Sequence, residues 1–448
     1  MINVFGEGVD AVITINLLLK AGAQVKHHYQ SGKFGGHFRG IDTCGGSHDS
    51  GLMLLEPDFI PGTAEDFDKY DGEFGRNSRA YLEEVFDWLK IQLGDFTTHE
   101  VVTMLPSHKL VGDYFIGDCL EFLNTLNLRQ RKELEERLIL FLNDVPNLRH
   151  LHPANKLTSE LASKIPLSEF LEIIYGPEVY ALYFKGFLEK VTGSGLTFIS
   201  SRDNRRVWMP NFYPESILFA LNQAPEYRCY ELNPLRFLRP ESGSIADFVQ
   251  SLQLENETSR NYQKHKIKLE EFKFDFNDRD SVYFIHLNDL PRNHLHEVQF
   301  GNLFAKRMAL NNEPHFIDIT HFCVAEIESR TVFVADELSQ VIRYSYYSDQ
   351  KGGSISVESI SGDLDPKVLA LQILATDNFE ATCGGHSQKV PIRIKQTNFP
   401  MKEWSDFSDR FKSKYPNLNQ SIFLIHPEAN SFNDNLLRGL VAFRRRDL

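Results

Sequence analysis

Residues 2–30 read INVFGEGVDAVITINLLLKAGAQVKHHYQ, and the order of strand, glycine turn and helix in this stretch decides the fold. The apolar residues 2–5 predict a buried strand, and the residues after the glycines predict a largely apolar helix. Gly22 lies where a helix end is expected, and a second strand begins near Gln24. A strand, a helix and a second strand in this order predict a βαβ unit of a parallel sheet.

The turn between strand and helix has the spacing of a dinucleotide-binding motif. Gly6 permits a tight turn, and Gly8 lets the backbone approach a pyrophosphate near the helix N-terminus. Ala11 replaces the third glycine of the motif, where the helix packs on the strand. The alternative interpretation is that both glycines serve only a tight turn in a buried α/β sheet.

The end of the second strand lacks the acidic residue that accepts hydrogen bonds from an adenosine ribose. Tyr29 and Gln30 occupy the two positions where Asp or Glu is expected. The Gln30 amide oxygen can accept one hydrogen bond, without the strength that a charge adds.

A second glycine turn and an Asp-x-Gly element follow, and with them the sequence resembles a known superfamily. It is similar to flavin-containing amine oxidases, protoporphyrinogen oxidases and UDP-galactopyranose mutases, which share a GxGxxG helix start, a GG(R)xx(T/S) turn and an aspartate-x-glycine element. Gly35, Gly36 and Arg39 match the turn, and Asp49 with Gly51 matches the last element. His37 stands where these proteins usually have arginine.

The resemblance implies an α/β fold, in which a Rossmann-like, NAD(P)-binding-like domain for FAD is interleaved with a helical and antiparallel-sheet substrate domain. We expect residues 1–60, 200–290 and 395–448 to form the FAD domain, 61–199 a helical region and 291–394 an antiparallel sheet. Apolar residues at helical spacing, as at Leu82, Val85, Phe86 and Leu89, support the helical region. The aromatic residues 175–187 are interpreted as core.

Two further site predictions follow from the same resemblance. In such proteins the antiparallel sheet lies over the flavin, so Arg343, Tyr344 and Tyr346 are candidate substrate contacts, although aromatic residues also simply favour strands. The closing strand and helix place Asn433 as a candidate cofactor contact near the start of a helix. His426 and Pro427 replace the Gly-Asp pair that usually follows this strand.

The composition of the chain limits which binding partners and which cellular compartment we expect. The 448 residues carry 48 basic and 61 acidic side chains, a net charge of −13, which disfavours nucleic acid and favours a small-molecule substrate. The five cysteines form no CxxC pair, and four histidines near the glycine turns lack helix-fixed spacing, so no disulfide framework or metal site is predicted. With no apolar run of about 18 residues and no signal peptide, we expect a cytoplasmic protein without a transmembrane segment. A homodimer stays open.

The sequence is compatible with three functions, and it identifies no catalytic residue. The first is FAD-dependent oxidation of a small amine or C–H donor, with hydride transfer to flavin. The second is a redox-neutral, mutase-like reaction on a nucleotide sugar. The third is a non-catalytic homologue that has lost tight FAD binding, which the residues Tyr29, Gln30, His426 and Pro427 motivate.

Overall fold

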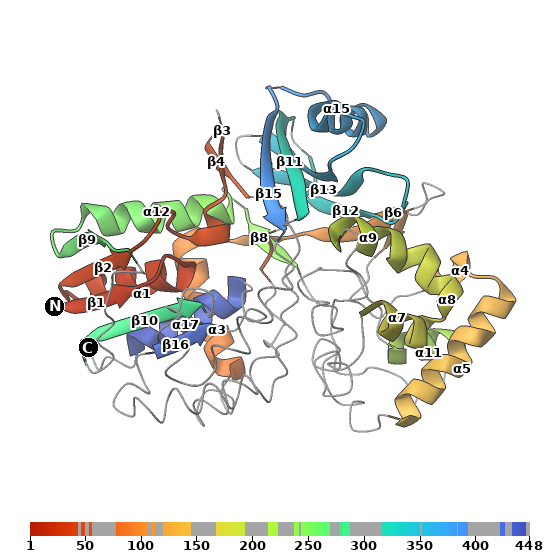
Figure 1. The fold of residues 1–448 in the computed structure, drawn as a ribbon, viewed down its shortest axis with the longest axis horizontal. Helices are drawn as coiled ribbons and strands as arrows, with labels where there is room; N and C mark the ends of the chain where they lie inside the picture. Colours follow the sequence, from red (N-terminus) through yellow and green to blue (C-terminus); the bar gives the residue numbers. More distant parts are fainter. Residues whose placement is uncertain are drawn as a thin grey trace.

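The computed structural model has two large sheets, two small two-stranded sheets and several helices among its described residues (Figure 1). The described residues are 1–43, 46–49, 53–55, 78–104, 110–112, 120–144, 167–192, 214–222, 237–241, 243–268, 278, 280–286, 315–325, 327–349, 352–382, 384–392, 422–425 and 432–444. Among them, no helix is long and apolar enough to cross a membrane.

The first sheet is parallel and is assembled from segments far apart in the sequence. It has the order β16-β10-β1-β2-β9, and each neighbouring pair runs parallel. Its strands are β1 (Ile2–Phe5), β2 (Val25–Tyr29), β9 (Tyr262–Lys266), β10 (Ser281–His286) and β16 (Ile422–Ile425). Because β1 lies between β10 and β2, the motif at its end faces the middle of the sheet edge, where parallel α/β sheets bind ligands.

Four helices pack around this sheet. They are α1 (Val9–Lys20), α3 (Ser78–Leu93), α12 (Ile245–Thr258) and α17 (Phe432–Arg444). Helix α1 contacts both α12 and α17, so the beginning, the middle and the end of the chain meet in one layer (Figure 1). Their apolar side chains form one core, in which Val4, Val12 and Leu18 are fully buried. Gly94 ends α3 with φ +79°, as its position in the sequence predicts.

The second sheet is mostly antiparallel and has the order β15-β11-β14-β13-β12-β6-β7. Its strands are β6 (Glu100–Met104), β7 (Leu110–Gly112), β11 (His315–Val324), β12 (Arg330–Val334), β13 (Val341–Asp349), β14 (Gly352–Ile360) and β15 (His386–Ile392). Helix α15 (Pro366–Thr376) contacts β11, β14 and β15. Strands β6 and β7 come from the region expected to be helical, and β6 joins β12 as a parallel neighbour.

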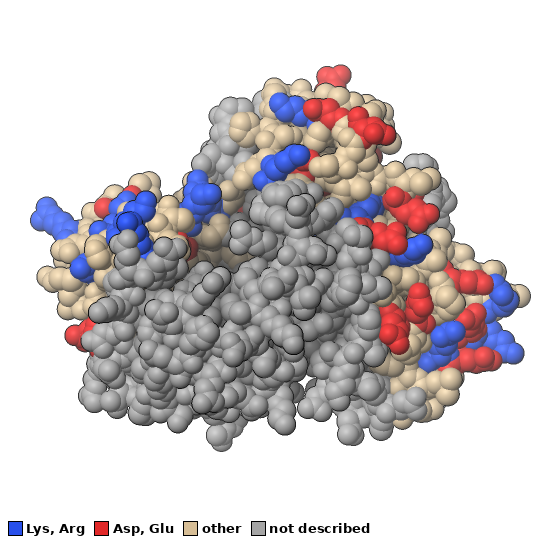
Figure 2. All heavy atoms as spheres, in the orientation of Figure 1, with Lys and Arg blue, Asp and Glu red and all other residues tan. Residues whose placement is uncertain are grey.

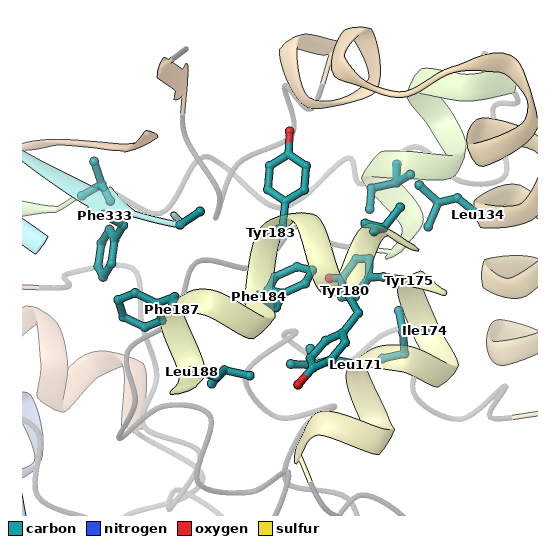
Figure 3. Close-up of a cluster of buried hydrophobic side chains, with 14 of the residues drawn as sticks. Leu134, Leu171, Ile174, Tyr175, Tyr180, Tyr183, Phe184, Phe187, Leu188 and Phe333 are labelled. Atoms are coloured by element: carbon teal, nitrogen blue, oxygen red, sulfur yellow. The ribbon is translucent and has the colours of Figure 1, made fainter. Parts of the chain in front are cut away.

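The helices between residues 120 and 222 bury the aromatic residues that were interpreted as core from the sequence, which confirms that interpretation. Tyr175, Tyr183, Phe184 and Phe187 belong to one buried cluster (Figure 3). The helical segments are α4 (Leu120–Thr125), α5 (Leu128–Asp144), α7 (Leu167–Tyr175), α8 (Pro177–Tyr180), the π-helical turn η4 (Ala181–Lys185), α9 (Gly186–Thr192) and α11 (Pro214–Asn222).

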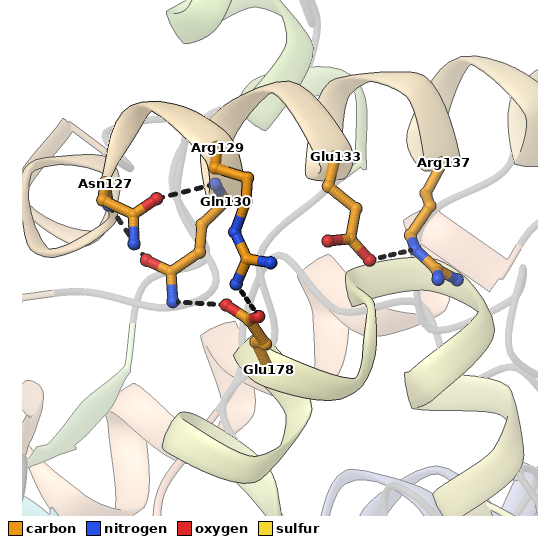
Figure 4. Close-up of polar contacts among 6 residues, drawn as sticks. All are labelled: Asn127, Arg129, Gln130, Glu133, Arg137 and Glu178. Atoms are coloured by element: carbon orange, nitrogen blue, oxygen red, sulfur yellow. Dashed lines mark hydrogen bonds and ion pairs between the residues drawn. The ribbon is translucent and has the colours of Figure 1, made fainter.

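Polar contacts on the outside of this part connect α8 to the start of α5 (Figure 4). The backbone N–H of Gln130 donates to the Asn127 side chain at 3.0 Å, and that of Asn127 donates to the Gln130 side chain at 2.9 Å. Glu178 on α8 accepts hydrogen bonds from Arg129 and Gln130. On the face shown in Figure 2, acidic and basic side chains are mixed over this end of the molecule.

Helix α9 is attached to the second sheet through a glycine and a buried lysine. A Cβ on Gly186 would lie 2.4 Å from the Ala335 carbonyl oxygen, so only glycine permits this approach. Lys190 Nζ donates to the carbonyls of Val334, Asp336 and Val341 at 2.5, 2.9 and 2.7 Å. One ammonium therefore satisfies three carbonyls where β12 turns into β13.

Short elements link the two sheets. Strand β3 (Ile41–Thr43) pairs with β4 (Gly46–His48), and β5 (Phe96–Thr98) pairs with β8 (Leu238–Pro240). The 3-10 helix η1 (Gly36–Arg39) lies against α12. Alternation of apolar residues at Ile267, Leu269 and Phe272 predicts a strand there; β9 ends before it, at Lys266, and residues 269–277 lie outside the described part of the chain.

Candidate functional site

The first glycine of the motif has the geometry of a tight turn. Gly6 has φ +135°, and a Cβ there would lie 3.0 Å from Phe284 Cβ on β10. Its N–H donates to the His28 carbonyl at 3.3 Å, and its own carbonyl lies 2.6 Å from His27 Nε2. The turn is therefore fixed from both neighbouring strands, and a larger residue does not fit.

The second glycine lies beside the second glycine turn. Gly8 forms a parallel bridge with Gly35, whose N–H donates to the Glu7 carbonyl at 2.7 Å. Gly8 is also the N-cap residue of α1, and it makes no side-chain hydrogen bond to the first turn of the helix. Backbone N–H groups at such a helix start can bind an anion. Ala11 is fully buried in the same helix, as expected for the packing position.

The two turns are adjacent because Gly35 fits closely against α12. Gly35 has φ +86°, and a Cβ there would lie 2.3 Å from Val249 Cγ1. Gly36 also has a positive φ, +56°, but a Cβ on it would meet none of the described residues within 4 Å. The Arg39 carbonyl accepts a hydrogen bond from the Gln250 side chain at 3.0 Å. The first glycine is thus required by packing, while the second faces open space.

Asp49 lies buried at the start of α12. Its Oδ1 accepts a hydrogen bond from the Ala246 N–H at 2.8 Å, in the first turn of a helix that Ser244 and Asp247 also cap. Burial raises the pKa of the Asp49 carboxyl to about 6, although the Ala246 N–H and the charge of Arg239 act in the opposite direction. This carboxylate fixes the chain after β4 against α12.

Arg239 connects the Asp49 region to the second sheet. Its guanidinium lies 4.7 Å from the centre of the Tyr347 ring and donates to the Gly243 carbonyl at 3.2 Å. The His99 ring is 5.7 Å from that of Tyr347, and its Nε2 lies 2.8 Å from Thr331 Oγ1. Sequence reasoning missed this buried polar cluster, because its members come from strands that only the fold brings together.

The remaining cofactor candidates are placed as follows. Gln30 is exposed at the end of β2. Gly51 lies outside the described residues, as do His426 and Pro427. Asn433 is in the first turn of α17, and its side chain is outside the described part.

A carboxylate that the sequence analysis did not single out lies beside Gln30. Glu7 accepts hydrogen bonds from the Ser31 N–H at 2.8 Å and from the Gly32 N–H at 2.5 Å. The Ser31 hydroxyl lies 3.0 Å from the other carboxylate oxygen. The only sequence feature that could have pointed to Glu7 is that it is an acidic residue between the two glycines of the motif.

The candidate substrate contacts lie within the second sheet. Arg343 Nε donates to Glu358 Oε1 at 2.6 Å across the β13–β14 pair. Tyr344 and Tyr346 are buried, and the Tyr346 hydroxyl donates to Asp377 Oδ2 at 2.8 Å. Their role as substrate contacts stays a prediction.

The two histidines of β2 have structural partners. His27 Nδ1 lies 2.7 Å from the Tyr262 hydroxyl, and the His28 ring stacks on Phe5 at 4.2 Å. Burial lowers the pKa of each imidazole to about 4, and for His28 the neighbouring His265 adds to the effect. Both are therefore neutral near pH 7. Within the described ranges, no group of three or more His, Cys, Asp or Glu side chains could hold a metal ion.

Comparisons with known proteins identify the fold. No protein-family model has a significant match to the sequence, and neither has any curated protein. The structure is similar to reduced UDP-galactopyranose mutase, with a TM-score of 0.62 and 12% identity over 98% of this chain and 94% of that one. Putrescine oxidase bound to putrescine gives a TM-score of 0.47 with 12% identity over 99% of this chain and 97% of that one. A CLA-producing fatty acid isomerase from P. acnes gives 0.49 with 10% identity over the same shares, 99% and 97%.

The match to the mutase extends over nearly the whole chain and confirms the fold class expected from the sequence. The chain has an α/β fold similar to that of reduced UDP-galactopyranose mutase, with a parallel Rossmann-like sheet and a mixed, mostly antiparallel sheet. The division into 1–60, 200–290 and 395–448, 61–199 and 291–394 stays a prediction.

Proposed function

We propose that this protein binds FAD and is an oxidoreductase acting on a small amine or C–H donor. The observation that carries the proposal is the contact of Gly8 with Gly35, next to the start of α1. It brings both glycine turns of the resemblance to the carboxyl edge of a parallel sheet, where dinucleotides bind in this architecture.

The residues present fit the diphosphate half of such a cofactor. Gly6 and Gly8 would allow the backbone to approach it, and the N–H groups of Val9 and Asp10 at the start of α1 would donate to its oxygens. The next N–H group, of Ala11, donates to Asp10 Oδ1 at 2.9 Å. Gly36 leaves the space of a side chain empty beside the same turn. Arg39, Asp49, Gly51 and Asn433 are the further positions that we expect to hold or to frame the cofactor.

When bound, FAD supplies a group that accepts a hydride, and this chain would contribute orientation and a suitable electrostatic environment. The N-terminus of α17, where Asn433 lies, favours negative charge, as on a reduced flavin. The buried cluster of Arg239, Tyr347 and His99 links the second sheet to the segment before α12 and would fix their relative position. No side chain is assigned as a nucleophile, acid or base.

A second function, a redox-neutral reaction on a nucleotide sugar, is favoured by the similarity to UDP-galactopyranose mutase. This reaction consumes no oxidant. It therefore differs from the first proposal in its stoichiometry as well as in its substrate.

One experiment separates these functions in the FAD-loaded protein. Under anaerobic conditions, a panel of small amines is added to oxidised protein, and UDP-galactopyranose is added to dithionite-reduced protein. Loss of the oxidised flavin bands with an amine supports the oxidoreductase. Conversion of the sugar nucleotide without net reductant consumption contradicts it and supports the mutase-like reaction. FAD-loaded protein that does neither, over broad panels, contradicts both and supports a non-catalytic homologue.

A further inference from the structure

The strand end that should carry a ribose-binding acid carries none. Tyr29 is the last residue of β2, and Gln30 is exposed beside it. A carboxylate at this edge is the usual acceptor for the adenosine ribose hydroxyls of a dinucleotide. Without one, the diphosphate contacts alone would have to position the ligand.

The structure places a different carboxylate at the same point. The Glu7 backbone belongs to the turn after β1, but its side chain reaches the first residues after β2. There it accepts the N–H groups of Ser31 and Gly32 at 2.8 and 2.5 Å. Ser31 directly follows Gln30, so the Glu7 carboxylate lies one residue from the position where the acid is missing.

The Glu7 carboxylate retains capacity to accept further hydrogen bonds. A carboxylate has about four lone-pair sites, and among the described residues three protein donors approach it: the Ser31 N–H, the Ser31 hydroxyl and the Gly32 N–H. The Glu7 residue is only partly buried. Two backbone N–H groups fix the orientation of the carboxylate before any ligand binds, so little conformational entropy is lost when a ligand hydroxyl donates to it.

We infer that Glu7 supplies the ribose-binding carboxylate of this protein, from the glycine turn instead of from the end of β2. The inference rests on the proposed function, because it places the adenosine half of the cofactor at this sheet edge. It also implies selectivity. A free 2′-hydroxyl can donate to Glu7, whereas a 2′-phosphate would be repelled by it.

The test measures binding, by calorimetry, of FAD, ADP and 2′-deoxy-ADP to the wild-type chain and to Glu7→Gln. The wild type should bind ADP roughly tenfold or more tightly than 2′-deoxy-ADP, because a charge-assisted hydrogen bond is lost. Glu7→Gln should bind FAD and ADP roughly tenfold more weakly and should discriminate less between the two ADP ligands. The comparison of ligands on the wild type needs no variant and is independent of its folding.

Two further variants serve as controls. Glu257→Gln removes a carboxylate from α12 near β9 and should leave all three affinities unchanged. Glu7→Gln combined with Gln30→Glu returns a carboxylate to the end of β2 and should recover the preference for ADP over 2′-deoxy-ADP.

The outcomes separate this inference from the proposed function. Wild type that binds FAD, with Glu7→Gln binding equally or more tightly, overturns the inference and leaves the function standing, since Glu7 would then block the site or be a bystander. Ribose-dependent ADP binding without FAD binding keeps the inference and overturns the function. Absence of binding to both FAD and ADP overturns both.

Discussion

Arg438 donates a hydrogen bond from Nε to Asp10 Oδ2 at 3.0 Å, across 428 residues of sequence, and both side chains are buried. The two helices approach closely around this pair, since a Cβ on Gly439 would lie 3.0 Å from the Asp10 carbonyl oxygen. The Thr14 hydroxyl, 3.0 Å from the Gly439 carbonyl, adds a second polar contact. Helix α17 is therefore fixed against α1, beside the parallel sheet that β1 belongs to.

Arg438→Met should destabilise the protein by about 3–5 kcal/mol, because the Asp10 charge stays buried without its partner. Urea unfolding, followed by circular dichroism, measures this. The double variant Asp10→Asn with Arg438→Met should recover part of the loss. A single variant within about 1 kcal/mol of wild type would contradict the assigned role of the pair.

Lys190→Met should cost about 3 kcal/mol, because two buried carbonyls and one partly buried carbonyl lose their common donor. Lys185→Met is the matched control. Among the described residues its ammonium pairs only with Glu189, at 4.0 Å with both side chains about half exposed, so little change is expected. Equal stability of the two variants would show that the carbonyls find other donors, contrary to this prediction.

Asp49→Asn should stabilise the protein near pH 7. The folded pKa of Asp49 is raised to about 6 from 3.8 by burial, so its ionisation costs stability as the pH rises from about 4 to 6. Two pKa units correspond to about 3 kcal/mol, the upper limit of the gain. Asparagine keeps an acceptor for the Ala246 N–H.

The measurement for Asp49 is the difference in unfolding free energy between Asp49→Asn and wild type, at pH values from 4 to 8. His27 and His28 also titrate in acid, but they do so in both proteins and cancel in the difference. The gain should grow from pH 4 to pH 6 and then level off. A gain that does not vary with pH would contradict the raised pKa.

Gly8→Asp should abolish FAD binding without loss of the fold. Gly8 has φ −70° and ψ 172°, which any residue adopts, and aspartate caps helix N-termini well. Its charge would repel the diphosphate. Gly8→Ser caps the helix without a charge and should bind FAD more tightly than Gly8→Asp. Equal FAD affinity of these two variants, with unchanged melting temperatures, would place the diphosphate elsewhere.

Local patterns predicted the first βαβ unit well. The run of apolar residues, the glycines and the helix end at Gly22 are all encoded within about 30 residues, the size of such a unit. The polar strand β9 has little alternation of apolar and polar residues, so its sequence does not predict a strand. Its extended conformation is determined by backbone pairing with β2. Strand β6 is likewise fixed by pairing with the distant strand β12, and β7 then pairs with β6.

The candidate site was predicted where backbone conformation dominates and missed where side chains reach across the fold. Gly6 and Gly35 have the positive φ angles that their motifs require. The direction of Glu7 toward Ser31 depends on how the turn meets β2, which no spacing encodes. For the same reason, the contact between Arg438 and Asp10 could not be read from a pattern.

The most direct test of the central proposal is the visible absorption spectrum of the purified protein after gel filtration, with and without added FAD. Flavin bands that comigrate with the protein, at about one FAD per chain as one dinucleotide motif implies, are the predicted result. A colourless protein that also fails to retain added FAD would contradict the proposal that this fold binds flavin here.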